Sequence, residues 1–188
     1  MIIFIIPKNS GLSVCRDIAK NYSGEILEVR GEDVPLFVSD LSKQGKSVIG
    51  ITGEDLYKEF LLNNKDNNIL VLEIIRWEDS KCLFGKPTLC LLGPKDKQIE
   101  NLPQKLRICI NRKYQKLTNK YCVNKLVSSG YEVEKIYVSG ASEEMFLRKM
   151  VDLVIDIVYS GKSAEEAGLE VYEKLFCSDI VVIGGKRI

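Results

Sequence analysis

Histidine is absent from this sequence of 188 residues. Its absence excludes a Ser-His-Asp triad and a histidine general base, so any proton transfer falls to Asp, Glu, Lys, Tyr or Cys. It also removes a common zinc ligand, and the six cysteines include no Cys-x-x-Cys pair, so no zinc site is expected. Because most of the cysteines lie in apolar runs, we expect free thiols in a reducing cytoplasm, without disulfide bonds.

Long apolar segments and net charge are also lacking. The apolar run at residues 1–6 is too short to span a membrane, and it lacks the charged leader and cleavage site of a signal peptide. The formal net charge is +1, so no general attraction to nucleic acid or to an acidic membrane is expected. An anion site in this protein must therefore be built from local groups.

Short apolar runs alternate with amphipathic segments along the chain. The apolar runs predict strands at residues 2–6, 25–29, 47–52, 69–75, 88–92, 106–110, 132–138, 151–158 and 178–183. The amphipathic segments predict helices at 12–21, 33–43, 55–62, 115–128, 143–149 and 163–168, with a loop at 63–68. Such alternation favours an α/β fold with mostly parallel sheets and helices on both faces.

The pattern restarts after Gly93-Pro94, which suggests two lobes. We expect residues 1–88 and 171–188 to form the first lobe and residues 89–170 to form the second. Two α/β lobes provide a natural ligand site in the cleft between them.

The segment with the clearest chemistry spans residues 151–169, where an apolar strand leads into a small, hydroxyl-rich turn and then a helix. Helix-start N–H groups lack partners, and Gly161 allows the backbone to approach an anion closely. Ser160 and Ser163 offer hydroxyl donors, and Lys162 offers a positive charge. We therefore expect a phosphate-binding loop, with an ordinary helix cap at Ser160 as the simpler alternative.

A Walker A loop is excluded at this place. Gly161-Lys162-Ser163 resembles the end of that motif, but Asp156 stands where the motif needs its first glycine. A carboxylate there suits the hydroxyl groups of a ribose, directly or through Mg²⁺, which favours a phosphorylated ribose as ligand. Residues four apart on a strand point to one face, so Asp152 and Asp156 are both candidates, with a solvent-facing Asp152 as the alternative.

A series of short motifs occurs in a characteristic order along the chain. The motifs are Ile5-Ile6-Pro7-Lys8, Arg30-Gly31-Glu32-Asp33-Val34-Pro35, Ile49-Gly50-Ile51-Thr52-Gly53-Glu54-Asp55-Leu56, Phe84-Gly85, Arg107-Ile108, Lys113-Tyr114, Gly140 with Glu143, residues 152–169, and Ser178. The ordered set resembles the ATP phosphoribosyltransferase family, although no single motif is specific to it.

This resemblance implies a two-lobed α/β fold like that of the type II periplasmic binding proteins, with the ligand cleft between the lobes. It implies transfer of phosphoribose from phosphoribosyl pyrophosphate to N1 of ATP, with Mg²⁺ and release of pyrophosphate, as the first step of histidine biosynthesis. It also implies a short-form enzyme, because no regulatory domain follows Ile188. Such short-form enzymes work with a histidyl-tRNA-synthetase-like partner subunit, and a homo- or hetero-oligomer is expected.

The resemblance also suggests roles for individual residues. Catalytic roles fall to Asp156 and to Lys8, which would neutralise pyrophosphate, and Glu143 would contact ribose or order the loop. The residues expected to bind phosphoribosyl pyrophosphate are Asp152, Asp156, Tyr159, Ser160, Gly161, Lys162 and Ser163, and Mg²⁺ would bind Asp152 and Asp156. The residues expected on the nucleotide side are Arg30, Thr52, Gly53 and Glu54.

Two further expectations concern the first lobe. Asp33 is expected to cap the helix at 33–43, and Arg30 either pairs with it or faces the cleft. The family's opening Lys-Gly-Arg-Leu is replaced by Lys8-Asn9-Ser10-Gly11-Leu12, which loses a basic residue. Changes of this kind motivate an alternative function, in which a non-catalytic or regulatory homologue binds a phosphorylated ribose or small anion.

Overall fold

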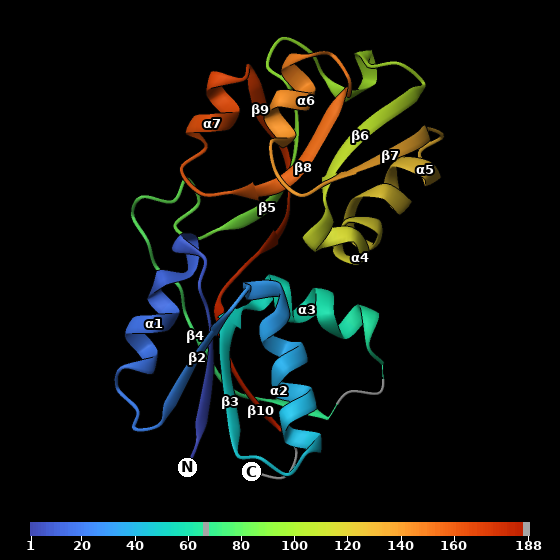
Figure 1. Ribbon diagram of the computed structural model, residues 1–188. Helices are drawn as coiled ribbons and strands as arrows, with labels where there is room; N and C mark the ends of the chain where they lie inside the picture. Colours follow the sequence, from blue (N-terminus) through green and yellow to red (C-terminus); the bar gives the residue numbers. More distant parts are fainter. Residues whose placement is uncertain (66–67, 186–188) are drawn as a thin grey trace. The chain divides into compact units, whose positions relative to one another are not determined.

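The computed structural model describes residues 1–65 and 68–185 (Figure 1). The chain divides into two compact units: unit 1 comprises Met1–Trp77 with Asp179–Ile188, and unit 2 comprises Glu78–Ser178. The boundaries therefore fall at 77/78 and 178/179, not at the expected 88/89 and 170/171. The second boundary moves because residues 169–177 form a strand of the unit 2 sheet.

Unit 1 contains a five-stranded sheet in the order β2-β1-β3-β10-β4. Its strands are β1 (Ile3–Pro7), β2 (Glu25–Val29), β3 (Val48–Gly53), β4 (Ile69–Ile75) and β10 (Ile180–Gly185). β1 pairs in parallel with β2 and β3, whereas β10 lies between β3 and β4 and runs antiparallel to both. The last strand of the chain is therefore an inner strand of the first unit.

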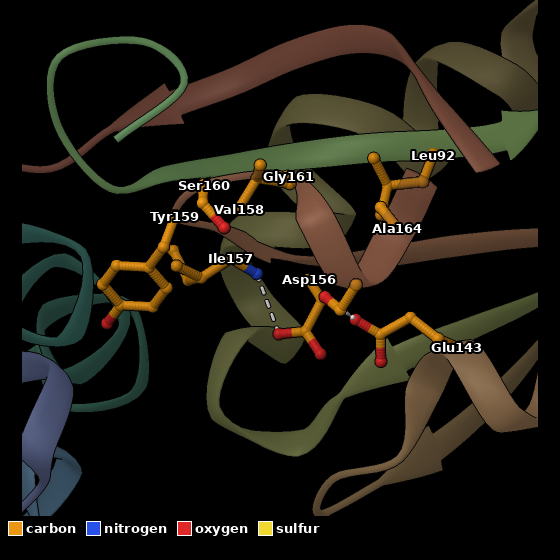
Figure 2. Close-up of a pocket in the computed structure, with 10 residues that line it drawn as sticks. Leu92, Glu143, Asp156, Ile157, Val158, Tyr159, Ser160, Gly161 and Ala164 are labelled. Carbon is orange, nitrogen blue, oxygen red and sulfur yellow. Dashed lines mark hydrogen bonds between the residues drawn. The ribbon is translucent and has the colours of Figure 1, made fainter. Parts of the chain in front are cut away.

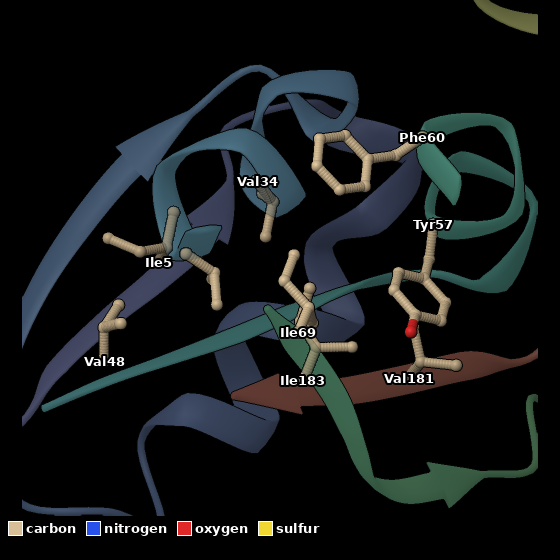
Figure 3. Close-up of a cluster of buried hydrophobic side chains, with 9 residues drawn as sticks. Ile5, Val34, Val48, Tyr57, Phe60, Ile69, Val181 and Ile183 are labelled. Atoms are coloured by element: carbon tan, nitrogen blue, oxygen red, sulfur yellow. The ribbon is translucent and has the colours of Figure 1, made fainter. Parts of the chain in front are cut away.

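Three helices cover the two faces of this sheet. Figure 1 shows α1 (Ser13–Ala19) on one face and α2 (Val34–Lys43) and α3 (Glu54–Asn63) on the other. Ile5 packs against α2 and α3 in the core cluster of Figure 3, while its neighbour Phe4 stacks on Tyr22 with 5.4 Å between ring centroids. The side chains of successive strand residues therefore pack on opposite faces of the sheet. Burial of each such aliphatic or aromatic side chain stabilises the folded protein by about 1.5–3 kcal/mol.

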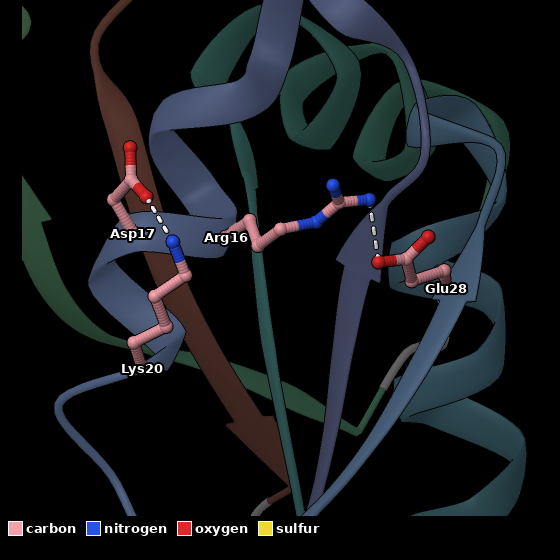
Figure 4. A network of polar contacts seen from close by, with 4 residues as sticks. All are labelled: Arg16, Asp17, Lys20 and Glu28. Carbon is pink, nitrogen blue, oxygen red and sulfur yellow. Dashed lines mark hydrogen bonds and ion pairs between the residues drawn. The ribbon is translucent and has the colours of Figure 1, made fainter.

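Figure 4 shows one ion pair between α1 and β2 and one local pair at the end of α1. The Arg16 guanidinium lies 2.6 Å from Glu28 Oε1 of β2, and Lys20 Nζ lies 2.8 Å from Asp17 Oδ1. Both pairs are exposed to solvent and add little to stability. The helix is held mainly by Cys15 and the buried Ala19 on its inner face.

The start of α2 differs from the expectation in one respect. Asp33 makes no side-chain capping hydrogen bond, because residues Gly31–Asp33 already form a 3₁₀ turn that continues into the helix. Asp33 therefore has helical backbone angles, φ −90° and ψ −16°. Pro35, whose fixed φ suits the first helical turn, marks the start of the helix instead.

Unit 2 contains a second five-stranded sheet in the order β7-β6-β8-β5-β9. Its strands are β5 (Thr88–Pro94), β6 (Lys105–Asn111), β7 (Glu132–Val138), β8 (Leu153–Val158) and β9 (Leu169–Cys177). β6 pairs in parallel with β7 and β8, and β5 runs antiparallel to both β8 and β9. Both sheets are therefore mixed, whereas mostly parallel sheets were expected.

The helices of unit 2 are short. The predicted helix at 115–128 is present as α4 (Gln115–Thr118) and α5 (Asn124–Ser128), joined by a π-helical turn at Asn119–Val123. α6 (Ser142–Leu147) and α7 (Lys162–Glu166) contribute to a core cluster that includes Cys109, Val154 and Ala164. In the part of the chain that the structure describes, no helix has the length and apolar character needed to cross a membrane.

Each predicted strand is present, with ends within two residues of the prediction. β9 is the strand that the sequence pattern missed. Its pairing with β5 shifts register twice, so the alternation of apolar and polar residues that marks a strand is interrupted. Of the predicted loop at 63–68, residues 66 and 67 lie outside the described residues.

Candidate functional site

The polar residues of unit 2 gather where its parallel strands finish. Asn111 is the last residue of β6, and Ser142 and Glu143 open α6 after β7. Asp156 lies near the end of β8, and the loop beginning at Tyr159 follows that strand. Because the carboxyl ends of parallel strands meet at one edge of a sheet, residues far apart in the sequence form one site there.

Asp156 makes the most hydrogen bonds in this site. Its Oδ1 accepts from the Ile157 backbone N–H at 2.8 Å and from Asn111 Nδ2 at 3.1 Å, and its Oδ2 accepts from the Ser142 hydroxyl at 2.7 Å. Burial raises the pKa of this carboxyl, against the effect of the three hydrogen bonds, and the charge of Glu143 raises it further. The site therefore fixes one carboxyl group in orientation beside a second acid.

Glu143 connects this carboxyl group to the loop that follows β8. Its Oε1 accepts a hydrogen bond from the Ser163 hydroxyl at 2.9 Å, and its Oε2 lies 3.1 Å from the Ser142 oxygen. Figure 2 shows the Glu143 and Asp156 carboxylates near each other, reaching in from α6 and β8. The start of α7 is thus tied to the acidic side of the site.

The loop between β8 and α7 has a backbone shape that favours glycine. Gly161 has a φ of +78°, in the left-handed region, and a Cβ at this position would lie 3.0 Å from Leu83 Cδ2. The Leu83 N–H donates to the Tyr159 carbonyl at 2.7 Å, and the Lys162 N–H donates to Ser160 Oγ at 3.3 Å. Two hydrogen bonds therefore fix the turn, one from the Leu83 backbone and one within the turn to the Ser160 side chain.

A pocket of about 80 Å³ lies between this loop and the two carboxylates (Figure 2). Its lining residues are Leu92, Glu143, Asp156, Ile157, Val158, Tyr159, Ser160, Gly161, Ser163 and Ala164. The volume exceeds the roughly 30 Å³ that a water molecule occupies in the liquid, but it is too small for a whole nucleotide. Hydroxyl groups and turn backbone form one side and carboxylates the other. This chemistry suits a ligand with an anion at one end and hydroxyl groups near it.

Most of the residues expected at the phosphate loop line this pocket, but two of their side chains are directed elsewhere. The Lys162 ammonium lies 3.8 Å from Glu166 Oε1 in an exposed pair on α7. The Tyr159 ring extends away from the Asp156 carboxylate (Figure 2). Tyr159 therefore lines the pocket with its backbone and not with its ring.

The structure separates Asp152 from Asp156. Asp152 directly precedes β8 and Asp156 lies within it, and a step of four residues along a strand spans about 13 Å, so the two carboxylates are far apart even though they share a face. Asp152 Oδ2 accepts a hydrogen bond from the Arg107 backbone N–H at 2.8 Å, beside the start of β6. The pair does not form one Mg²⁺ site, and residues 1–65 and 68–185 contain no group of three or more Cys, Asp or Glu arranged to hold a metal ion.

Lys8, expected to neutralise pyrophosphate, and the residues expected on the nucleotide side lie in unit 1, where β1, β2 and β3 end. Lys8 follows β1 and is exposed, with its backbone N–H bonded to the Val29 carbonyl at 2.7 Å. Arg30 follows β2, and its guanidinium lies 3.7 Å from Glu32 Oε1. The ion pair expected between Arg30 and Asp33 is thus made with the neighbouring Glu32 instead.

At the end of β3, the expected residues serve the fold. Thr52 is fully buried and donates its hydroxyl to the Gly31 carbonyl at 3.2 Å. Gly53 ends the strand, and the backbone N–H of Glu54 donates to the Asp179 carbonyl at 2.7 Å. The Thr52 side chain therefore supports the turn after β2.

Sequence reasoning missed Asn111 and Ser142. Asn111 donates to Asp156 and accepts from the Lys113 backbone N–H at 3.2 Å, so it joins the acid to the turn that precedes α4. Ser142 lies directly between Asp156 and Glu143. A usable signal was present, because a polar residue at the end of a predicted parallel strand lies at the edge where such sites form.

The family model of ATP phosphoribosyltransferase matches residues 30–188, which is most of the chain. The chain belongs to the ATP phosphoribosyltransferase family. The match spans every residue of the unit 2 site, so the pocket is part of the region that the family shares.

Two relatives illustrate the similarity. ATP phosphoribosyltransferase from Caldicellulosiruptor saccharolyticus is 35% identical over 150 residues, which cover 80% of this chain and 62% of the relative. ATP phosphoribosyltransferase from Bacillus cereus is 28% identical over 158 residues, which cover 84% and 64%. The chain thus spans a little over three fifths of the length of these curated relatives.

Solved structures agree on the fold. The ATP phosphoribosyl transferase (HisG:HisZ) complex from Thermotoga maritima matches with a TM-score of 0.72 at 22% identity, over 99% of this chain and 88% of that one. The periplasmic aliphatic sulphonate binding protein SsuA from Escherichia coli matches with a TM-score of 0.63 at 14% identity, over 98% and 65%. The fold is therefore the two-lobed α/β fold of type II periplasmic binding proteins, as expected from the family resemblance.

Proposed function

We propose that this protein binds phosphoribosyl pyrophosphate through the unit 2 pocket and transfers its phosphoribosyl group to N1 of ATP. The main support is the pocket itself, where Ser160, Gly161 and Ser163 form one side and Asp156 and Glu143 form the other. Membership of the ATP phosphoribosyltransferase family supports the same substrate and reaction. In the cell this reaction is the first step of histidine biosynthesis, and we propose that it takes place in the cytoplasm.

The serine side of the pocket is proposed to hold the 5′-phosphate. Ser160 and Ser163 supply hydroxyl donors, and the left-handed Gly161 lets backbone N–H groups approach the phosphate oxygens without a side chain in the way. Lys162, whose ammonium lies 3.8 Å from Glu166 Oε1, is proposed to add positive charge to this side. Hydrogen bonds to an ionised group are stronger than those between neutral groups, so a few such donors are enough to orient the ligand.

The acidic side is proposed to hold the ribose. Asp156 and Glu143 are acceptors, and ribose hydroxyl groups are donors, so the two sets are complementary. In the reaction the bond between C1′ and the pyrophosphate oxygen breaks, pyrophosphate leaves with the electron pair, and adenine N1 forms a bond to C1′. Positive charge develops on the ribose before the new bond is complete, and two fixed carboxylates stabilise it electrostatically. Such a mechanism needs no histidine.

Mg²⁺ belongs to this proposal as part of the substrate complex. The ion is commonly held by one or two carboxylates together with substrate phosphates, and it supplies charge neutralisation for a departing pyrophosphate. Asp152 and Asp156 are too far apart to hold one ion between them, so no resident site is assigned to that pair. Lys8, Arg30 and Glu54 stay proposals for contacts with pyrophosphate or ATP.

We also propose that the protein acts in an oligomer with a second, histidyl-tRNA-synthetase-like subunit. The Thermotoga structure that resembles this chain is a HisG:HisZ complex. The direct test mixes purified protein with ATP, phosphoribosyl pyrophosphate and Mg²⁺, with and without such a subunit, and follows product absorbance. Turnover in either mixture supports the transferase. Binding of phosphoribosyl pyrophosphate with no turnover in both mixtures favours the alternative, a binding or regulatory homologue, and absence of binding rejects both.

A further inference from the structure

Residues 79–85, which precede β5, form a small closed loop. The Asp79 backbone N–H donates to the Gly85 carbonyl at 2.8 Å. Inside the loop, the Cys82 and Gly85 N–H groups donate to the Asp79 and Cys82 carbonyls, each at 3.0 Å. Gly85 has a φ of +75°, in the left-handed region that glycine reaches without strain. The Phe84-Gly85 motif of the sequence therefore closes this loop.

Two side chains anchor the loop to unit 2, one on each side of Leu83. Cys82 is buried, and Phe84 packs against the core cluster that includes Ala164, with the Lys174 ammonium 4.8 Å from the centre of its ring. Leu83 lies between these anchors, but 53% of its own surface is exposed. Single exposed leucines are ordinary, so exposure alone assigns no role to this residue. The role of Leu83 therefore has to be read from its contacts.

Leu83 contacts the glycine turn, residues 159–161, at two places. Its backbone N–H donates to the Tyr159 carbonyl at 2.7 Å. Its side chain lies against Gly161, because a Cβ placed on that glycine would be 3.0 Å from Leu83 Cδ2 and 3.9 Å from Leu83 Cγ. One residue of the loop at 79–85 therefore contacts both the start and the end of the turn.

The hydrogen bond from Leu83 also sets the direction of a donor in the turn. A peptide unit is planar, and in its trans form the carbonyl and the N–H point in opposite directions. The described residues, 1–65 and 68–185, contain no cis peptide bond. The Tyr159 carbonyl points at Leu83, so the N–H of Ser160, which belongs to the same peptide unit, points away from Leu83.

The opposite side of the turn from Leu83 is the pocket with the two carboxylates. The turn lies between two pockets: Leu83 and Phe84 line one of about 340 Å³, and Asp156 and Glu143 line the one of about 80 Å³ (Figure 2). The two turn residues that follow Tyr159 line both pockets, whereas Leu83 lines the larger one alone of the two. An N–H that points away from Leu83 is therefore directed to the smaller pocket, where the phosphate is proposed to bind.

We propose that Leu83 is a positioning residue for phosphate binding. Its backbone N–H orients the peptide unit between Tyr159 and Ser160, and its side chain keeps Gly161 in place, so the donors of the turn are arranged before the ligand arrives. The inference rests on the proposed function, because phosphoribosyl pyrophosphate supplies the phosphate. Donors that are already ordered lose less entropy on binding, which strengthens affinity. Leu83 does not line the pocket of the proposed reaction, so its effect falls on affinity and not on the chemical step.

The first experiment tests the support of the turn in the free protein. Amide hydrogen exchange followed by NMR reports on the Lys162 N–H, which is bonded to Ser160 Oγ, and on the Glu165 N–H, which is bonded to the Gly161 carbonyl at 3.0 Å. We expect Leu83→Ala to speed both exchange rates by about threefold to tenfold, the loss expected for the packing of a half-buried leucine.

The matched control for this experiment is Leu147→Ala. Leu147 is the last residue of α6 and is 54% exposed, so the change removes the same side chain at nearly the same exposure. Both exchange rates should stay at their wild-type values in this variant. Leu83→Met, which supplies an apolar side chain of similar volume, should return them toward wild type. Rates that are unchanged in Leu83→Ala, or raised equally in both alanine variants, overturn the inference, whatever the protein binds.

The second experiment measures affinity by calorimetry, with phosphoribosyl pyrophosphate and with ribose 5-phosphate. Both ligands carry the 5′-phosphate, so Leu83→Ala should weaken both by the same factor, about threefold to tenfold. Leu83→Pro, which removes the N–H that orients Tyr159, should weaken both further. Thermal denaturation shows whether each variant is folded, and the alanine and methionine variants carry the test if the proline variant is not. In turnover measurements, Leu83→Ala should raise KM and leave kcat unchanged.

The two measurements separate the possible failures. If wild type binds phosphoribosyl pyrophosphate and folded Leu83→Ala binds it equally well, the inference is overturned and the proposed function stands. If wild type binds neither ligand, the proposed function fails, and the inference that Leu83 positions the turn for phosphate fails with it. Faster exchange together with an equal loss of affinity for both ligands, restored in Leu83→Met, supports both.

Discussion

The Ser163 hydroxyl donates a hydrogen bond to Glu143 Oε1 at 2.9 Å, which ties the first turn of α7 to the start of α6. In the proposed function, a phosphate in the pocket competes with Glu143 for this hydroxyl. The same residue therefore has two competing acceptors, one in the protein and one in the ligand.

This competition gives the first prediction. Ser163→Ala should weaken binding of phosphoribosyl pyrophosphate by about threefold to tenfold, roughly 0.5–1.5 kcal/mol, because the hydroxyl exchanges one charged acceptor for another. Ser163→Thr keeps the hydroxyl and should stay close to wild type in calorimetric affinity. Equal affinities for the alanine and threonine variants would exclude Ser163 from the phosphate site.

Gly161 and Gly168 form a matched pair for a second prediction. Both have left-handed backbones, with φ of +78° and +74°, so alanine at either position costs about 1–2 kcal/mol of stability. A Cβ at Gly161 also meets Leu83 beside the pocket, whereas at Gly168 it meets nothing within 4 Å. Thermal denaturation should therefore show similar losses, and only Gly161→Ala should lose affinity for phosphoribosyl pyrophosphate. An equal loss of affinity in both variants would mean that backbone strain alone is responsible.

A third prediction separates the two aspartates. Asp152→Ala removes the acceptor of the Arg107 N–H and should lower the free energy of unfolding by about 1–3 kcal/mol without changing ligand affinity. Asp156→Ala should reduce affinity strongly, because it removes an acceptor from the pocket. Urea unfolding and calorimetry on the same preparations measure the two effects. Loss of affinity in correctly folded Asp152→Ala would contradict this prediction and show that Asp152 contributes to ligand binding.

The raised pKa of Asp156 predicts how stability depends on pH. The folded protein holds the Asp156 proton more tightly than the unfolded chain does, so this group's contribution is fully present below its ordinary value of 3.8. It is lost as the pH rises through the raised pKa. Urea unfolding at a series of pH values should therefore show that wild type loses stability relative to Asp156→Asn across this window. A constant difference would show that burial does not perturb this carboxyl.

The cysteines give a chemical test of the core. The structure contains free thiols at Cys15, Cys82, Cys90, Cys109 and Cys122, all buried, and an exposed thiol at Cys177. Burial raises the pKa of Cys15, Cys90 and Cys122 to about 12, which leaves little thiolate to react. Iodoacetamide at mildly alkaline pH should label Cys177 first, and all six cysteines in denaturant, as read by mass spectrometry. Early labelling of Cys15 would show that the α1 face opens readily.

Much of this fold follows from local pattern. β2, β4 and β7 are found at the predicted residues because each is a short run of β-forming side chains bounded by polar turns. β9 was missed because its apolar residues do not alternate regularly with polar ones, and its pairing with β5 shifts register twice. Only this pairing shows the segment to be a strand. The antiparallel direction of β5 and β10 was missed for a similar reason, since strand direction depends on the path of the chain between strands.

The site residues also differ in how far the local sequence could predict them. The glycine turn and its serines were predictable, because they are consecutive and their chemistry is local. The partnership of Asn111, Ser142 and Asp156 was not, because it joins residues from three strand ends that meet only in the folded sheet. Asp152 shows the opposite error: spacing on one strand face suggested proximity, whereas distance along the strand separates it from the loop.

The position of β10 bears on how the protein is made. Unit 2 is one continuous stretch, so all of it is available for folding once Ser178 has left the ribosome. Unit 1 lacks the strand that joins β3 to β4 until residue 185 has left the ribosome. The unit begun first is therefore finished last, and β4 remains without its pairing partner throughout synthesis of the second unit. A chain that ends at Ser178 should contain a folded unit 2 attached to a unit 1 sheet that lacks β10.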